Sequence, residues 1–260
     1  MRTLEPIPPK AWDEIKKEAT EVLKSALSAR KIVDIEGPKG MDHPAVPLGR
    51  LETPDVDQEH DLRYGIHSIM PMVELKSLFT LNIHEIETIA RGARDVNLDP
   101  VQKAANRLAI AEDEIVYQGF EKAGITGLAN SSKYNKIKWP EKITGIPKAV
   151  TESVLMLKQH NIDGPYSLLL ESEKWDELYR MNGSYPLIEQ IREIVDGHIV
   201  LNKNTKDSLL VSERGNDFIL TLGQDISMGY EYQEQEDLRL YLLESFSFMV
   251  VEPRAVALYE

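Results

Sequence analysis

The 260-residue sequence predicts an α+β fold, in which helices and strands follow one another in irregular order. Three observations support this class. Apolar residues recur at three- and four-residue steps in several long segments, which is typical of amphipathic helices. The last quarter of the chain holds short apolar runs typical of strands, and no internal repeat or flexible linker divides the sequence. The length allows one large domain or two modest ones with a sizeable core.

The first predicted element is a long helix that begins at Pro8 and Pro9, where a missing N–H group costs nothing. Its apolar face consists of Trp12, Ile15, Ala19, Val22, Leu23, Ala26 and Leu27, and charged residues cover the other face. Two interpretations of this helix remain open. It packs on its own domain, or it is an N-terminal arm with a partly free apolar groove.

Residues 30–68 predict an extended excursion from the body of the protein. Glycine and proline interrupt the pattern repeatedly, and residues 53–61 contain four acidic side chains with Val56 as their one apolar residue. A stretch of this length with little core of its own is unusual in a compact monomer. We interpret it as a hairpin-like arm that reaches a neighbouring subunit.

The remaining elements follow from turn residues and periodicity. Residues 69–81 are strand-like, and Asp99 is expected to cap a second long helix that has Pro100 at its first position and ends at Gly119 or Gly124. Further helices are predicted at 147–159, after a cap at Ser172, and from Pro186 onwards. Strands are predicted at 166–170, 199–201, 209–211, 218–222 and 238–251, with a turn at 215–216.

The composition disfavours several classes of function. The chain contains no cysteine, which excludes disulfides, thiolate nucleophiles and cysteine-based zinc sites. The net charge of −13 argues against a general nucleic-acid binder. The longest apolar runs, such as 246–251, are far shorter than the ~20 residues of a membrane-spanning helix, and the N-terminus lacks the apolar stretch of a signal peptide. We expect a soluble, cytoplasmic protein that contacts neither membrane nor nucleic acid.

The sequence contains no recognisable catalytic motif. Phosphate-binding glycine loops and the serine nucleophile elbow are absent. None of the six histidines pairs at the spacing used by zinc proteases, so we interpret them as polar surface or hydrogen-bonded residues, with a scattered-histidine metal site as the alternative. Glu112, Asp113 and Glu114 are adjacent on the second long helix and point in different directions, which favours a solvated helix face over an acid–base pair. No catalytic residue, metal or cofactor is therefore predicted.

Five motifs, spread over the whole chain, resemble one protein family. They are Arg-Lys-Ile-Val-Asp-Ile-Glu-Gly-Pro at 30–38, Gly-Pro-Tyr-Ser-Leu at 164–168, Leu-Val-Ser-Glu-Arg-Gly at 210–215, Gly-Gln-Asp-Ile-Ser-Met-Gly-Tyr-Glu at 223–231, and Phe-Ser-Phe followed by Val-Val at 246–251. In content and order these resemble the family 1 encapsulins, shell proteins once described as linocin-type bacteriocins. The resemblance runs essentially from end to end.

The resemblance implies the Hong Kong 97-like fold of tailed-bacteriophage major capsid proteins. Residues 1–46 would form the N-terminal helix and the start of the peripheral domain, and residues 47–81 would form the extended loop, or E-loop. Residues 82–130 would hold the spine helix of the peripheral domain, and residues 131–221 would form the axial domain. Residues 222–252 would return to the peripheral domain as strands, and residues 253–260 would form a C-terminal tail.

The resemblance also implies a function. The chain would self-assemble into an icosahedral nanocompartment of about sixty copies or a multiple. This shell would enclose cargo enzymes of ferritin-like or dye-decolourising peroxidase type, each held on the luminal wall by its C-terminal targeting peptide. Two alternatives stand beside this reading: a phage or prophage capsid protein that packages DNA, which shares the fold, and a soluble enzyme, which the residue search does not support.

The family's cargo groove maps onto six residues of this chain: Leu23, Leu27, Arg30, Asp34, Met228 and Tyr230. The leucines would take apolar anchors of the peptide, while Arg30 and Asp34 would orient it through charged hydrogen bonds. Alternatively, Arg30 and Asp34 pair with each other and the leucines pack internally.

Two further family features map onto loops and strands. The segment Asn182, Gly183, Ser184 and Tyr185 matches the loop around the five-fold pore, which would admit ions and small metabolites; a plain helix–helix turn is the alternative. Some members hold a flavin with a tryptophan and an arginine, but this chain has His84 and Lys76 at the matching positions. Histidine offers less stacking area and lysine lacks the planar fork, so no flavin is expected.

Overall fold

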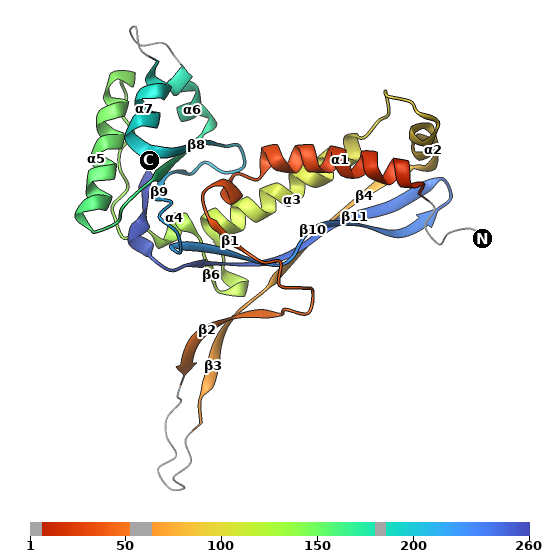
Figure 1. The fold of residues 1–260 in the computed structure, drawn as a ribbon, viewed down its shortest axis with the longest axis horizontal. Coiled ribbons are helices and arrows are strands. Elements are labelled where there is room, and N and C mark those ends of the chain that lie inside the picture. Colours follow the sequence, from red (N-terminus) through yellow and green to blue (C-terminus); the bar gives the residue numbers. More distant parts are fainter. Residues whose placement is uncertain (1–6, 53–63, 180–185) are drawn as a thin grey trace.

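Two four-stranded sheets organise the residues that this computed structural model describes, which are 7–52, 64–179 and 186–260 (Figure 1). Each sheet carries its own helices, and the buried apolar side chains form two clusters. One lies on the first sheet, and the other extends from the second sheet to Phe218, Phe246 and Phe248 of the first. A two-stranded hairpin projects away from both sheets. This mixture of helices and mostly antiparallel strands confirms the predicted α+β class.

The first sheet has the strand order β1-β10-β11-β4. Its strands are β1 (Asp34–Glu36), β4 (Val73–Asn82), β10 (Phe218–Glu234) and β11 (Asp237–Val250). β10 and β11 form a long antiparallel pair that runs from Phe218 opposite Val250 to Glu234 opposite Asp237. β10 is much longer than the predicted strand at 218–222. Register shifts between Leu222 and Ser227 break the two-residue alternation there, and this hides the strand in the sequence.

Three helices pack on the first sheet: α1 (Pro9–Ala26), α2 (Ile83–Arg91) and α3 (Asp99–Gln118). α1 lies beside α3 (Figure 1), and it buries Ala11, Ile15, Ala19 and Leu23 at four-residue spacing. This helix therefore packs on its own domain, as one of the two interpretations expected.

The beginnings of α2 and α3 differ from the expectation. α3 begins with Asp99 as its first residue and has Leu98 at the cap position, so the Asp99 side chain lies in the first turn instead of capping it. α2 was not predicted. It follows β4 without a break, and Asn82 caps it by accepting a hydrogen bond from the backbone N of His84 at 2.9 Å.

The second sheet has the strand order β12-β9-β7-β8. Its strands are β7 (Tyr166–Glu171), β8 (Asp196–Asn202), β9 (Ser208–Ser212) and β12 (Val256–Tyr259), and its helices are α5 (Ile146–Gln159), α6 (Ser172–Tyr179) and α7 (Leu187–Val195). The smaller elements are η1 (Ala29–Lys31), β5 (Gly119–Phe120), η2 (Glu121–Ala123), β6 (Ile125–Thr126), α4 (Leu128–Ser131), η3 (Ile143–Gly145) and η4 (Pro253–Ala255).

Residues 253–260, which the resemblance assigns to a C-terminal tail, contain η4 and β12. β12 pairs antiparallel with β9, from Val256 opposite Val211 to Tyr259 opposite Ser208, and all of its residues are buried. A four-residue strand that is buried on both faces shows no polar–apolar alternation, so the sequence pattern does not reveal it.

The projecting hairpin consists of β2 (Ala45–Glu52) and β3 (Ile66–Pro71) (Figure 1). Leu51, Ile66 and Ile69 on it are each more than half exposed. The predicted strand at 69–81 is thus two strands, β3 and β4, which meet at Met72. Within the described residues, the arm does extend from the body as expected, and residues 53–63 between its two strands lie outside them.

Candidate functional site

A groove lies between α1 and the first sheet and has a volume of about 320 Å³. Here β10 is the edge of the sheet, because β1 pairs with β10 only from Ile219 to Thr221. The groove is lined by Lys16, Ala19, Thr20 and Leu23 of α1, Ile226, Ser227 and Met228 of β10, and Leu242 of β11. Five of its eight lining residues are apolar, and Lys16 is the one charged residue among the eight.

Local sequence explains this lining. Lys16 is three and four residues before Ala19 and Thr20, and Leu23 is four and three residues after them, so all four share one flank of α1. Small side chains at positions 19 and 20 leave space beside the strand. On β10, the register shift between Gln224 and Ser227 precedes Met228, and it changes which side chains face the helix.

Of the six predicted groove residues, two line this groove, Leu23 and Met228. Leu27 is buried in the core instead, and the partly buried Tyr230 packs against the same core cluster. Asp34 lies at the start of β1, where its Oδ2 accepts a hydrogen bond from the backbone N of Asn216 at 2.6 Å.

Arg30 binds three carboxylates from three elements. Its Nε lies 2.9 Å from both carboxylate oxygens of Glu112 on α3, and its Nη2 lies 2.5 Å from Glu112 Oε2 and 2.9 Å from Glu244 Oε2 on β11. Its Nη1 donates to Asp225 Oδ1 of β10 at 2.8 Å. Arg30 and Asp34 therefore have separate partners, and the alternative that they pair with each other is wrong. The guanidinium joins the segment after α1 to both α3 and the sheet.

Glu112 and Asp113 correct the interpretation of a solvated helix face, because both side chains are fully buried, at 0% exposure, while Glu114 is exposed. Asp113 accepts hydrogen bonds from the backbone N of Ser28 and of Ala29, at 3.1 and 3.0 Å, and from the side chain of Asn204 at 2.7 Å. A sequence signal for this burial exists: Glu112 is four residues after Leu108 and three before Ile115, both in the apolar stripe of the helix.

Burial dominates the electrostatics of this cluster. It raises the pKa of Glu244 to about 10, and the hydrogen bond to Glu112 and its negative charge add to the shift, while Arg30 opposes it. Burial alone would lower the pKa of Arg30, but the hydrogen bonds and charges of its three carboxylate partners outweigh burial and raise it. Burial also raises the pKa of Asp113, and its hydrogen bonds to Ser28, Ala29 and Asn204 oppose that effect.

Of the pore-loop and flavin positions that the resemblance maps, the structure describes Lys76 and His84. The pore-loop residues Asn182, Gly183, Ser184 and Tyr185 lie outside the described residues. The Lys76 ammonium donates to Glu231 Oε1 at 2.7 Å and lies 4.3 Å from the centre of the Tyr241 ring. The exposed His84 side chain lies 3.5 Å from Glu236 Oε1.

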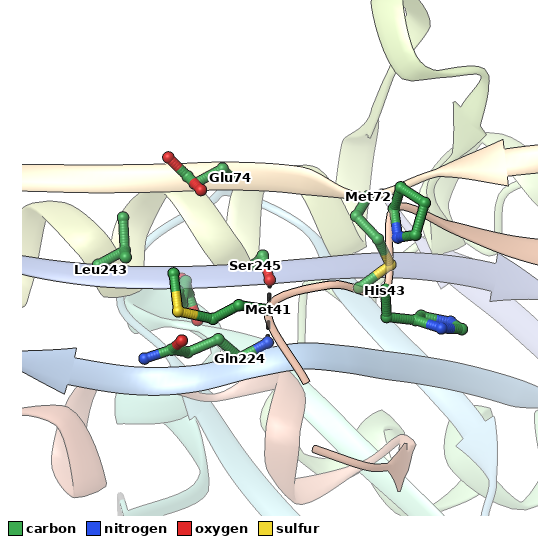
Figure 2. A pocket seen from close by; sticks show the side chains of 9 residues that line it. Met41, His43, Met72, Glu74, Gln224, Leu243 and Ser245 are labelled. Carbon is green, nitrogen blue, oxygen red and sulfur yellow. Dashed lines mark hydrogen bonds between the residues drawn. The ribbon is translucent and has the colours of Figure 1, made fainter. Parts of the chain in front are cut away.

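A second pocket, of about 240 Å³, lies where the chain enters the projecting hairpin. Figure 2 shows Met41, Met72 and Leu243 around it, with Glu74 and His43 at its sides. Ser245 Oγ accepts a hydrogen bond from the backbone N of Gln224 at 2.9 Å. Glu244 also lines this pocket, so the pocket adjoins the Arg30 cluster at β11.

Across 7–52, 64–179 and 186–260, no group of three or more histidine or acidic side chains is arranged to hold a metal ion. No helix in the described part of the chain is long and apolar enough to cross a membrane.

Sequence comparisons place the chain among shell proteins. Residues 1–247 match a family model described as an encapsulating protein for peroxidase. A type 1 encapsulin shell protein of Rhodospirillum rubrum is 37% identical, over 98% of this chain and 94% of the relative. Another from Mycobacterium tuberculosis is 32% identical, over 95% of this chain and 94% of the relative.

Solved structures share the fold at low sequence identity. A virus-like particle protein from Pyrococcus furiosus matches with a TM-score of 0.69 at 15% identity, over 96% of this chain and 99% of the other. The capsid protein of Myoviridae phage XM1 matches with a TM-score of 0.58 at 13% identity, over 90% of this chain and 91% of the other. These likenesses confirm the expected capsid-like fold. The chain therefore belongs to the family of type 1 encapsulin shell proteins.

Proposed function

We propose that this chain is the subunit of an icosahedral nanocompartment and that it assembles into a shell of about sixty copies or a multiple. The projecting hairpin is the observation that carries the proposal. It holds Leu51, Ile66 and Ile69 more than half exposed on an arm that extends beyond both cores. Exposed apolar side chains grouped on one element are typical of protein interfaces, and a neighbouring subunit is the partner that would cover them.

The proposal assigns a role in the shell to each part of the fold. The hairpin would be the E-loop, the first sheet with α1 and α3 the peripheral domain, and the second sheet with its helices the axial domain around the symmetry axes. The loop at 182–185 would surround the five-fold pore and admit ions and small metabolites. The shell would reside in the cytoplasm.

The groove beside α1 is the proposed docking site for the cargo's targeting peptide on the luminal wall. Leu23 and Met228 would contact apolar anchors of the peptide, and the Lys16 ammonium would favour an acidic side chain or the terminal carboxylate. The other four mapped residues would support the groove without lining it. Leu27 and Tyr230 pack in the adjoining core. Arg30 bonds to Asp225 and Asp34 bonds to the backbone of Asn216, and these contacts hold neighbouring segments in place. A ferritin-like protein or a dye-decolourising peroxidase is the proposed cargo.

A DNA-packaging capsid is the second candidate, and the likeness to the phage XM1 capsid favours it. The net charge of −13 per chain is a minor argument against it, because the chain offers no basic surplus to bind phosphates. Nuclease-treated particles separate the two candidates: a shell that retains no nucleic acid agrees with the nanocompartment, and protected DNA supports the capsid.

Light scattering behind a sizing column, with negative-stain images of the same peak, tests assembly. Uniform hollow spheres of megadalton mass are expected. A stable species at the monomer mass of 29.5 kDa, or at twice this mass, would refute the shell.

Cargo docking is tested by coexpression with a cargo enzyme that carries its targeting peptide. Met228→Asp places a charge in the groove, so we expect intact shells with cargo loading reduced by at least tenfold. Tyr232→Asp is the matched control, because Tyr232 lies on the same strand, is 49% exposed and is not part of the groove lining. Equal loading of both variants would exclude the groove as the docking site.

A further inference from the structure

Three carboxyl groups surround one guanidinium inside the protein. Glu112 and Glu244 are both fully buried, whereas the Asp225 carboxylate is 53% exposed. If all three were ionised, the cluster would carry a net charge of −2, most of it without access to water. Buried charges of like sign in contact are strongly unfavourable, and proteins relieve them by protonating one member.

The hydrogen bonds identify the member that is protonated. Arg30 donates to both oxygens of Glu112 but to only one oxygen of Glu244, namely Oε2. Glu244 Oε1 is buried and has no donor among the described residues. Arg30 Nη2 lies 2.5 Å from Glu112 Oε2 and 2.9 Å from Glu244 Oε2, so the two buried carboxyl groups meet at one nitrogen. Two ionised carboxylates repel each other at such close range, and a proton on one of them removes this repulsion. Glu244 is the better place for the proton, because its Oε1 accepts no hydrogen bond that the proton would displace.

Within the part of the chain that the structure describes, Arg30 is the one cation among the charged groups that act most strongly on Glu244. The strongest charged neighbours of Glu244 are Glu112 on α3, Arg30 on η1 and Asp225 on β10. Opposite Glu244, β4 presents Leu75. Farther along α3, Asp113 and Tyr117 are turned toward Ser28, which bonds to both of them.

We propose that Glu112 and Glu244 share one proton at neutral pH, and that this proton together with Arg30 fastens the segment after α1 to the sheet. Loss of the proton would leave an uncompensated charge in the core and weaken the contact between η1, α3 and β11. Since Arg30 bonds to Asp225, the residue before the groove residue Ile226, the same proton would also stabilise this end of the groove. The proton site itself does not depend on the proposed cargo function.

The direction of the pH effect follows from linkage. The pKa of Glu244 is raised from 4.5 to about 10 on folding, so the folded protein holds more protons than the unfolded chain between these values. Its contribution to stability is therefore complete below about pH 4.5 and is lost as the pH rises toward 10. Over this window the unfolding equilibrium constant rises by up to about tenfold per pH unit from this one group.

Infrared spectroscopy of the assembled full-length protein tests the proton directly. The wild type at pH 7 should show a carbonyl band from a protonated carboxyl group that decreases in Glu244→Gln. Glu74→Gln, on the exposed face of the same sheet, should leave this band unchanged. Unfolding midpoints supply the second readout: between about pH 6 and 9, they should fall less in Glu244→Gln than in the wild type or in Glu74→Gln.

Should Glu244→Gln fail to fold, Glu112→Gln removes the other half of the carboxyl pair and should remove the same band. The wild-type spectrum tests the proposal even if neither variant folds. Its lack of any protonated-carboxyl band at pH 7 would overturn the proposal, and so would equal bands or equal pH profiles in wild type and Glu244→Gln.

Discussion

Replacing Arg30 by methionine should destabilise the protein far more than loss of a surface ion pair would. Arg30→Met keeps most of the aliphatic volume but removes the guanidinium from two carboxyl groups that are 0% exposed. Three of its contacts go to Glu112 and one to Glu244, at 2.5 to 2.9 Å. Leaving buried acidic groups without their cation typically costs about 3–5 kcal/mol, which is a large share of a typical folding free energy of about 5–15 kcal/mol.

The three partners of Arg30 should contribute unequally. The Asp225 carboxylate is 53% exposed, so water screens this pair and Asp225→Asn should cost about 1 kcal/mol or less. The triple replacement Arg30→Met, Glu112→Leu and Glu244→Leu should recover most of the loss, because it removes the stranded acids together with the cation.

Denaturant unfolding, followed by intrinsic fluorescence under conditions in which all variants are in the same assembly state, measures these differences. A cost of Arg30→Met below about 1 kcal/mol would refute the argument, because it would mean that the buried acids do not need their cation. A triple variant as unstable as Arg30→Met would refute it as well, since the loss would then come from packing.

Two other predictions concern backbone and surface pairs. Gly37 has a φ of +118°, and an added Cβ would lie 2.5 Å from the carbonyl oxygen of Leu222 on β10. Gly124 has a φ of +67°, but a Cβ there would meet nothing within 4 Å. Gly37→Ala should therefore lower the midpoint of denaturant unfolding clearly more than Gly124→Ala. Equal midpoints for these two variants would contradict the predicted clash. The hydrogen bonds from Arg254 lower the pKa of Glu252 to about 2 despite partial burial. The ionised Glu252 therefore stabilises the fold above its unfolded pKa of about 4.5, and this stabilisation is lost as the pH falls toward 2. The difference in thermal unfolding midpoint between wild type and Glu252→Gln should shrink over that range. A constant difference would exclude the ion pair as the source of the difference.

Several elements could be predicted because their cause is local. The apolar spacing from Ile15 to Leu23 makes α1 amphipathic, and Pro100 begins α3 where a missing N–H is harmless. The hairpin arm follows from the concentration of glycine, proline and acidic residues in one stretch. The family motifs also come directly from the sequence, since their order along the chain needs no structure to be recognised.

The candidate groove could be predicted only in part. Leu23 and Met228 do line it, but Lys16, Thr20 and Ile226 enter the lining through the packing of α1 against β10. The register shift between Gln224 and Ser227 depends on how β10 pairs with β11. Ser227, for example, pairs with Leu243, which is sixteen residues farther along the chain. Such pairing has no local signature.

The sequence by itself determined the fold class, the helices with strong periodicity, the projecting arm and the shell-protein family, because each of these depends on residues close together in the chain or on motifs in a fixed order. Only the tertiary structure decided which carboxylates are buried and which groups they bind. Glu112 is adjacent to Asp113 in sequence, yet it binds Arg30, 82 residues away, while Asp113 binds the backbone of Ser28. Whether a carboxylate is solvated or buried depends on what packs over it, and here α3 faces η1 and β11, which come from opposite ends of the chain.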